Sequence, residues 1–272
     1  DGSGDPYLPL SQPSNPLNGR VGTYEGTIVD YRAVASYKFT PGVMGYAQFA
    51  TGFKGGGINP RPYFPEQILG FGPEQVRSYE IGLKTDLFDR KLRLNGLPGT
   101  PDLCGQILNL GDAKMKGIEL EATLRPVPGL TIDGALSYND FKFKEPKIAT
   151  PDFKKGDTRP GIGDFKWSVG VQYDLPIGDI GMLSPRVDYV HTPGYCGSLA
   201  NLCVTDPIRH VDSYDLVNAR LTFRTLDRDW SIALEVTNLT DKLYYINKLI
   251  TQYASVQPGR PREYALTVRR NF

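Results

Sequence analysis

The amino-acid sequence predicts an all-β protein, folded as an antiparallel meander of about eleven strands. Apolar and polar residues alternate with a period of two along most of the chain, and no stretch has a convincing helical period. The 272 residues include 30 glycines, 22 prolines and 16 tyrosines, a turn-rich composition that argues against a helical bundle or a doubly wound α/β enzyme. The connections between the expected strands are alternately short and long.

The strands are expected at regular intervals from residue 30 to the end of the chain. In residues 117–125, for example, Ile118 and Leu120 fall on the face opposite Glu119 and Glu121. Clear alternation occurs in residues 79–84, 117–125, 130–133, 167–173, 230–237 and 263–272. Weaker alternation occurs near residues 30–39, 43–53, 91–96, 183–190 and 215–224.

The expected connections fall into two classes. Short ones lie near residues 40–42, 88–91, 126–129, 176–181 and 226–229. Long ones lie near residues 54–77, 96–113, 141–164, 191–213 and 239–260. Short and long connections alternate along the chain, so all the tight turns would lie on one rim of the meander and all the long loops on the other. Transmembrane β-barrels are built in this way, with short periplasmic turns and long extracellular loops.

Alternation alone does not say whether the apolar face meets lipid or the dry interior of a soluble barrel. Aromatic residues at the strand ends favour lipid, because interfacial girdles of a membrane barrel are aromatic. They are Tyr31, Tyr37, Phe39, Tyr79, Trp167, Tyr173, Tyr189, Trp230 and Tyr264. The terminal Phe272 is expected to be the signal that outer-membrane assembly recognises. We therefore expect a membrane barrel in contact with outer-membrane lipid.

Charge and hydropathy exclude other classes. Lys and Arg (31) nearly balance Asp and Glu (30), so no nucleic-acid partner is expected. No run of 18 apolar residues is present, so no transmembrane helix is expected.

Several segments, taken in order, resemble the C-terminal part of a TonB-dependent outer-membrane receptor. They are residues 46–62, 74–84, 111–121, 236–242 and 258–262. The resemblance implies a barrel of 22 strands that is filled by a separate plug domain. It also implies an inner-membrane energy-coupling protein that acts through the plug, and uptake of a scarce nutrient, above all a ferric siderophore.

On this basis residues 1–27 are expected to be an extracellular loop segment, and residues 28–272 the C-terminal portion of the receptor barrel, with the plug domain absent. The chain is expected to be a receptor and transporter without cofactor or enzymatic activity. The alternative is a compact outer-membrane barrel of ten to twelve strands that acts as a passive pore, a surface enzyme or an adhesin.

Cations and aromatic rings in several long loops suit an anionic, ring-bearing ligand. The candidate ligand-binding residues are Lys54, Arg61, Tyr63, Phe64, Tyr195, Arg209, Tyr244, Tyr245 and Tyr253. The alternative for the tyrosines is packing within loops or at the membrane interface.

The three cysteines and two histidines also lie in expected loops. Cys196 and Cys203 are expected to form a short-range disulfide in an oxidising exterior, which leaves Cys104 without a partner in the sequence. His191 and His210 are both assigned to the loop near 191–213. A metal site or a pair of catalytic groups would need Asp206 or Asp212 beside these histidines. Solvated histidines in the loop are the preferred interpretation, so no metal or catalytic site is expected.

Overall fold

The structure is a computed structural model that describes residues 21–59, 68, 70–87, 92–95, 111–146, 154–157, 161, 163–197, 203, 206–250 and 254–271. Its regular structure is β-strand apart from short turns such as the 3-10 turn η2 (Pro207–Arg209). The strands of the main sheet are β1 (Arg32–Thr40), β2 (Val43–Lys54), β5 (Glu74–Leu87), β6 (Leu92–Asn95), β7 (Gly111–Leu124), β8 (Leu130–Pro146), β9 (Phe165–Tyr173), β10 (Leu175–Ile177), β11 (Gly181–Thr192), β14 (Tyr214–Thr225), β15 (Trp230–Thr237) and β18 (Glu263–Arg270). Short hairpins are formed by β3 (Gly57–Ile58) with β4 (Gly70–Phe71), β12 (Tyr195–Cys196) with β13 (His210–Val211), and β16 (Tyr245–Ile250) with β17 (Ala254–Pro258).

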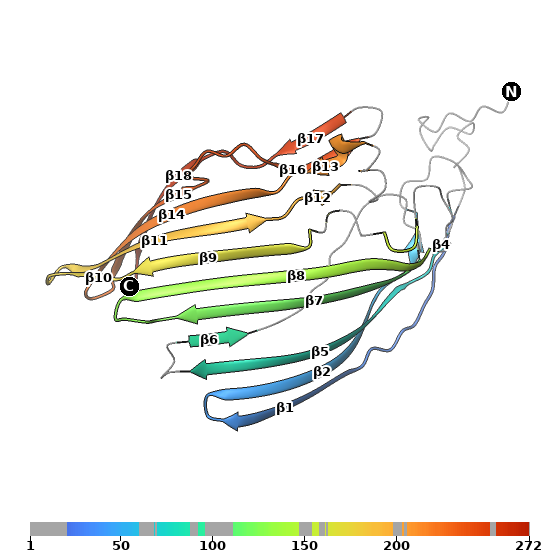
Figure 1. Cartoon of the computed structure of the whole chain (residues 1–272), viewed down its shortest axis with the longest axis horizontal. Helices are drawn as coiled ribbons and strands as arrows, with labels where there is room; N and C mark the ends of the chain where they lie inside the picture. Colours follow the sequence, from blue (N-terminus) through green and yellow to red (C-terminus); the bar gives the residue numbers. More distant parts are fainter. Residues whose placement is uncertain are drawn as a thin grey trace. The chain divides into compact units, whose positions relative to one another are not determined.

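The strand order confirms the predicted meander. Eleven strands follow one another in the order β1-β2-β5-β6-β7-β8-β9-β11-β14-β15-β18, and β10 pairs with β11 beside this path (Figure 1). The neighbouring strands from β5 to β7 and from β8 to β18 are antiparallel, for example with Leu130↔Tyr173 to Tyr138↔Phe165 between β8 and β9. Within the described residues β1 and β18 form the two edges of the sheet and are not paired with each other.

Contacts divide the chain into two compact units. Unit 1 comprises Asp1–Ala35, Tyr46–Ile81 and Gly99–Gly111, and unit 2 comprises Ser36–Gly45, Gly82–Pro98 and Asp112–Phe272. In unit 1, Arg32 of β1 donates to Gln48 of β2 at 2.8 Å, and Tyr46 of β2 donates to Glu80 of β5 at 2.6 Å. Unit 2 holds strands β6 to β18 apart from the first residue of β7, and most of the features described below lie in it.

Short connections join β1 to β2, β7 to β8 and β14 to β15, as predicted. The β14–β15 turn shows why a tight turn forms there. The carboxylate of Asp227 accepts hydrogen bonds from the hydroxyl of Thr225 at 2.5 Å and from the backbone N–H of Asp229 at 3.0 Å. Arg228 adopts a positive φ of 63°. These hydrogen bonds within the turn allow the chain to reverse its direction between β14 and β15 within four residues.

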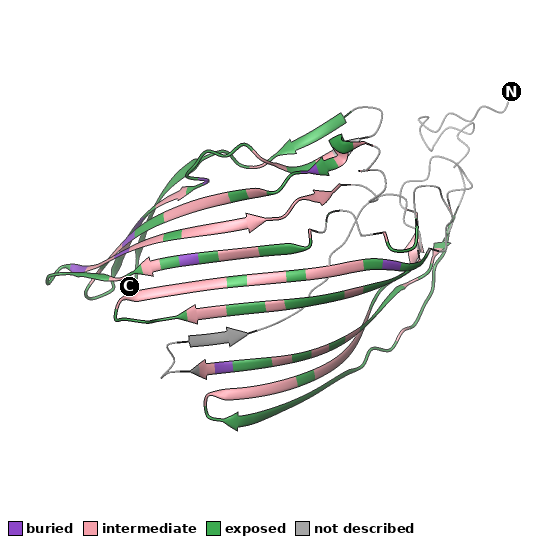
Figure 2. Cartoon of the chain, in the orientation of Figure 1, coloured by how far each residue is buried: buried purple, intermediate pink, exposed green. Residues whose placement is uncertain are grey.

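Many apolar side chains of the sheet are exposed, and in the edge strands β1 and β18 the residues of both faces are exposed. Ile118, Leu234 and Leu266 are 67%, 55% and 64% exposed. Figure 2 shows exposed positions along most strands, and only Phe143, Val211 and Ala233 are buried among the described hydrophobic residues. A soluble barrel would bury these aliphatic side chains, whereas a membrane barrel presents them to hydrocarbon.

The opposite face is polar and is held by ion pairs. The guanidinium of Arg186 on β11 contacts both carboxylate oxygens of Asp133 on β8, at 2.7 and 2.8 Å. It also contacts Asp188 at 2.6 Å. Gly170 of β9 lies between the two carboxylates in the register, opposite Asp133 and opposite Asp188. Because glycine has no side chain, the arginine can reach across β9 and bind both acids.

The expected boundaries differ from the structure mainly at the ends of the long connections. β7 begins at Gly111 and β8 continues to Pro146, so both strands run further than their apolar alternation. Segments expected to be loops contain the β3–β4, β12–β13 and β16–β17 hairpins. Phe272, the expected assembly signal, lies outside the described residues.

Candidate functional site

Four of the candidate ligand residues come from two long connections of unit 2. Tyr195 is in β12, Arg209 ends η2, and Tyr244 and Tyr245 stand at the start of β16. Lys54 ends β2 in unit 1 and is exposed. Arg61, Tyr63, Phe64 and Tyr253, together with Cys104, lie outside the described residues.

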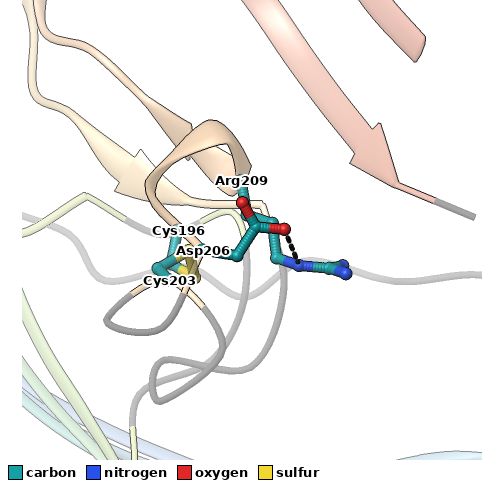
Figure 3. The surroundings of a disulfide bond; sticks show 4 residues. All are labelled: Cys196, Cys203, Asp206 and Arg209. Atoms are coloured by element: carbon teal, nitrogen blue, oxygen red, sulfur yellow. Dashed lines mark hydrogen bonds and ion pairs between the residues drawn. A yellow bond between two sulfur atoms is a disulfide. The ribbon is translucent and has the colours of Figure 1, made fainter. Parts of the chain in front are cut away.

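A disulfide closes the connection between β12 and η2. Cys196 and Cys203 are bonded, with Cα atoms 5.9 Å apart, in the pairing expected from the sequence (Figure 3). Cys196 is also opposite His210 in the β12–β13 hairpin. The backbone N–H of Gly197 donates to the carbonyl of Arg209 at 2.9 Å. The bond and the hairpin together fix the backbone on both sides of η2.

Arg209 is neutralised within its own turn. Its Nε donates to Asp206 at 3.2 Å, and Figure 3 shows this pair beside the disulfide. The charge of Arg209 is therefore already balanced by an acid three residues earlier. Any anion that binds this guanidinium has to compete with Asp206 or extend the network.

The β16–β17 hairpin is attached to the disulfide region. The hydroxyl of Tyr195 donates to the carbonyl of Ile246 at 2.5 Å. A Cβ atom at Gly197 would lie 2.7 Å from the carbonyl of Lys248, so glycine permits the close approach of these two backbones. Burial raises the pKa of Tyr195 above its usual value of 10, and the neighbouring Tyr214 adds to this rise.

Lys248 is a second cation in this hairpin. Its Nζ lies 3.4 Å from Asp212 and 5.6 Å from the ring centroid of Tyr245. The lysine side chain is only 14% exposed, whereas Asp212 is 82% exposed. The arrangement places a cation and an aromatic ring together, which is the chemistry that the sequence suggested, but the cation is one that sequence reasoning did not select.

The side chain of Asn238 joins the two ends of the last long connection, residues 239–260, by hydrogen bonds. It is buried, and its amide group donates to the carbonyls of Lys242 at 2.9 Å and Arg260 at 3.2 Å. Its side-chain oxygen accepts from the backbone N–H of Lys242 at 2.8 Å. These bonds hold residues 239–242 against residue 260, at the two ends of the connection that carries Tyr244 and Tyr245.

Tyr244, which lies in the same connection, packs against Tyr214. Its ring centroid is 4.4 Å from that of Tyr214 on β14, and its carbonyl accepts the N–H of Gly259 at 2.8 Å. Of the candidate tyrosines, Tyr195 and Tyr244 thus have packing or hydrogen-bonding partners within the loops. Tyr245 faces Lys248.

The placement of His191 in a loop was wrong. His191 is in β11, where it pairs in register with Trp167 of β9 and Asp215 of β14. Its Nδ1 lies 2.7 Å from the Asp215 carboxylate, and its ring stacks on Trp167 at 5.9 Å. The alternation of β11 extends as far as Thr192, so the histidine belongs to the strand-end aromatic group with Trp167 and Tyr189.

His210 is in β13, on a different element from His191. Among the described residues no group of three or more His, Cys, Asp or Glu side chains is arranged to hold a metal ion. In the described part of the chain, no helix is long and apolar enough to cross a membrane.

Two curated proteins that the chain is similar to are receptors. The chain is 25% identical over 249 residues to the metal-pseudopaline receptor CntO of Pseudomonas aeruginosa, covering 87% of this chain and 32% of the relative. It is 23% identical over 227 residues to the ferrichrome outer membrane transporter/phage receptor of Escherichia coli, covering 79% of this chain and 28% of the relative. The chain thus spans about a third of the length of the curated relatives it matches.

Solved structures show the same fold. The ferric yersiniabactin uptake receptor FyuA from Yersinia pestis superposes with a TM-score of 0.72 at 21% identity, over 89% of this chain and 37% of that one. The ferripyoverdine receptor of Pseudomonas aeruginosa, bound to ferripyoverdine, gives a TM-score of 0.59 at 19% identity, over 89% of this chain and 32% of that one. The family profile described as "TonB dependent receptor-like, beta-barrel" matches residues 10–239, and the chain therefore belongs to the TonB-dependent receptor family through its β-barrel domain.

Proposed function

We propose that this chain is the C-terminal portion of an outer-membrane receptor that takes up a ferric siderophore in an energy-dependent manner. The observation that carries the proposal is the two-faced meander. An exposed apolar face, a polar face held by ion pairs, and alternating short and long connections occur in a chain of the TonB-dependent receptor family. The relatives whose names state a ligand are receptors for iron or metal chelates, which supports a chelate as the substrate class.

The proposed ligand site is on the rim that carries the long connections. The ligand residues proposed are Lys54, Arg61, Tyr63, Phe64, Tyr195, Arg209, Tyr244, Tyr245 and Tyr253. The cation and ring at Lys248 and Tyr245 support an anionic, ring-bearing ligand, and we add Lys248 to this set. Disulfide and hairpin contacts fix the backbone of this rim before a ligand arrives, which lowers the entropic cost of binding.

The rest of the receptor is proposed to complete the barrel. The edge strands β1 and β18 each leave a row of backbone N–H and C=O groups without a partner in the described sheet. In hydrocarbon each such group costs several kcal/mol, so both edges need further strands. We propose that these strands, a plug domain and an inner-membrane energy-coupling protein act with this chain. Residues 1–27 are proposed to be an extracellular loop segment.

The test is uptake of radioactive iron by iron-starved cells that carry or lack the gene for this protein. Ferric siderophores of the hydroxamate, catecholate and carboxylate classes are supplied one at a time. The proposal predicts that one class is accumulated only when the gene is present, and that accumulation stops when a protonophore collapses the inner-membrane proton gradient. Gene-dependent entry that survives the protonophore would favour the passive pore, and no gene-dependent uptake of any ferric siderophore would contradict the proposed function.

A further inference from the structure

A hairpin closed by a disulfide lies in the long connection between β11 and β14. β12 and β13 form the hairpin, η2 precedes β13, and the disulfide joins Cys196 of β12 to Cys203 (Figure 3). We call β12, Gly197, Cys203, η2 and β13 the disulfide hairpin. It belongs to unit 2, as do the neighbouring long connections between β8 and β9 and between β15 and β18. The disulfide hairpin contacts both of these neighbours.

The first neighbour is the connection between β8 and β9. The backbone N–H of Gly161 donates to the carbonyl of Cys196 at 2.8 Å. A Cβ atom at Gly163 would overlap the ring of Pro193 and lie 3.2 Å from the carbonyl of Gly194. Glycine at position 163 therefore allows the two backbones to approach closely. The hydrogen bond joins this connection to the same cysteine that carries the crosslink.

The second neighbour is the connection between β15 and β18, which contains the β16–β17 hairpin. The hydroxyl of Tyr195 donates to the carbonyl of Ile246 at 2.5 Å, and the backbone of Gly197 lies close to the carbonyl of Lys248. β16 also contacts β13 and η2 (Figure 1). Both residues that flank Cys196 in the sequence therefore touch β16.

The disulfide stabilises the hairpin that makes these contacts. Cys196 is opposite His210 in the register, and the N–H of Gly197 donates to the carbonyl of Arg209 at 2.9 Å. A two-stranded hairpin is at best marginally stable by itself in water. A crosslink removes much of the conformational freedom of the open chain and so favours the closed hairpin. The contacts with both neighbouring connections therefore depend on the bond.

We propose that the disulfide hairpin is a brace that holds the described parts of these three long connections together as one cooperative unit. When the disulfide is broken, β12 separates from β13 and both neighbouring connections lose their contacts with it. The inference goes beyond the proposed function, because it concerns the mechanics of the rim and does not depend on the ligand. A ligand that touches one of these connections meets the other two in a fixed arrangement.

The test is hydrogen exchange of the backbone amides in the protein purified from outer membranes in detergent. A dithiol reduces the disulfide: two electrons and two protons pass to the two sulfur atoms, which become thiols, and the dithiol closes to a cyclic disulfide. The proposal predicts that exchange then becomes roughly tenfold faster or more both at Gly161 and in β16. The turn between β14 and β15 should exchange at an unchanged rate.

Variants check that the effect comes from this bond. The double variant Cys196→Ser with Cys203→Ser should exchange like the reduced protein without any dithiol. The matched control Cys104→Ser changes the third cysteine and should exchange like the unaltered oxidised protein. Faster exchange confined to the disulfide hairpin itself, with Gly161 and β16 unchanged, would overturn the proposal.

Tyr195→Phe distinguishes the two links of the brace. The variant removes the hydroxyl that is bonded to Ile246 and keeps the ring and the disulfide. Exchange should become roughly fivefold faster in β16 and stay unchanged at Gly161. Unchanged exchange in β16 would contradict the proposed link. Because exchange is measured without ligand, its outcome is independent of whether the protein takes up a ferric siderophore.

Discussion

Gly170 is predicted to be essential for the ion-pair network on the polar face of the sheet. A Cβ atom at this position would overlap Nη2 of Arg186 and lie 2.6 Å from Oδ1 of Asp188. In Gly170→Ala the guanidinium must therefore leave its position between Asp133 and Asp188. The substitution acts by displacing a neighbour, because Gly170 itself makes no side-chain contact.

The expected cost follows from the geometry. Overfilling a packed site costs about 1–3 kcal/mol. The side chains of Arg186, Asp133 and Asp188 are 26%, 37% and 32% exposed, so water screens part of the loss. Alanine in a strand recovers roughly 0.5–1 kcal/mol relative to glycine. We expect a net destabilisation of about 1–2 kcal/mol.

The assay is urea unfolding of the purified protein in lipid vesicles, followed by tryptophan fluorescence. Gly52→Ala is the control, because a Cβ atom at Gly52 of β2 meets nothing within 4 Å. The second comparison introduces Gly170→Ala into an Arg186→Gln background, where the clash is removed and the cost should largely disappear. A cost that persists in that background, or no cost in the original protein, would refute the reasoning.

Three other predictions concern the lipid face, the loop base and a turn. Leu120→Arg should cost roughly 2–4 kcal/mol of unfolding free energy near mid-strand, and Thr123→Arg on the opposite face much less; equal costs measured in vesicles would contradict the lipid assignment. Asn238→Ala removes a buried amide that holds both ends of the last connection, so about 1–3 kcal/mol should be lost and limited proteolysis should cut residues 239–260 faster; an unchanged cleavage rate would contradict this role. The hydrogen bond from Thr225 lowers the pKa of Asp227 from its usual 3.8, so its stabilising effect is present above pH 3.8 and is lost as the pH falls through the lower folded value. Asp227→Asn should reduce this acid dependence in unfolding curves, and an unchanged curve would show that the turn is not responsible.

The sequence predicted the strands well where apolar and polar residues alternate regularly. Alternation in residues 117–125 and 230–237 identifies β7 and β15, because successive side chains of a strand point to opposite faces. Further along β8 the apolar residues change to the other face of the strand. Lys142 and Lys144 continue β8 with a polar outward face, so the segment was read as a loop. The family resemblance, carried by ordered segments, is confirmed by the profile match.

The loop region could be predicted only in part. Cys196 and Cys203 are close in sequence, so their pairing could be expected. The contacts of Asn238 reach Arg260, 22 residues away, and Tyr195 reaches Ile246, 51 residues away. Neither the hairpins that make these contacts nor the role of Lys248 has a periodic signal. The assignment of the candidate residues to a ligand remains a proposal.

The most direct test of the account is the sidedness of the two rims in living cells. Single cysteines are introduced as Lys155→Cys in a long connection and as Ile180→Cys and Leu226→Cys in two short ones, in a background in which the native cysteines are replaced. Ile180 and Leu226 are exposed at 63% and 61%, so a reagent that reaches them can react. An impermeant thiol reagent added to intact cells should label position 155 and spare positions 180 and 226 until the outer membrane is opened. Labelling of all three positions in intact cells would contradict a sheet that crosses the outer membrane.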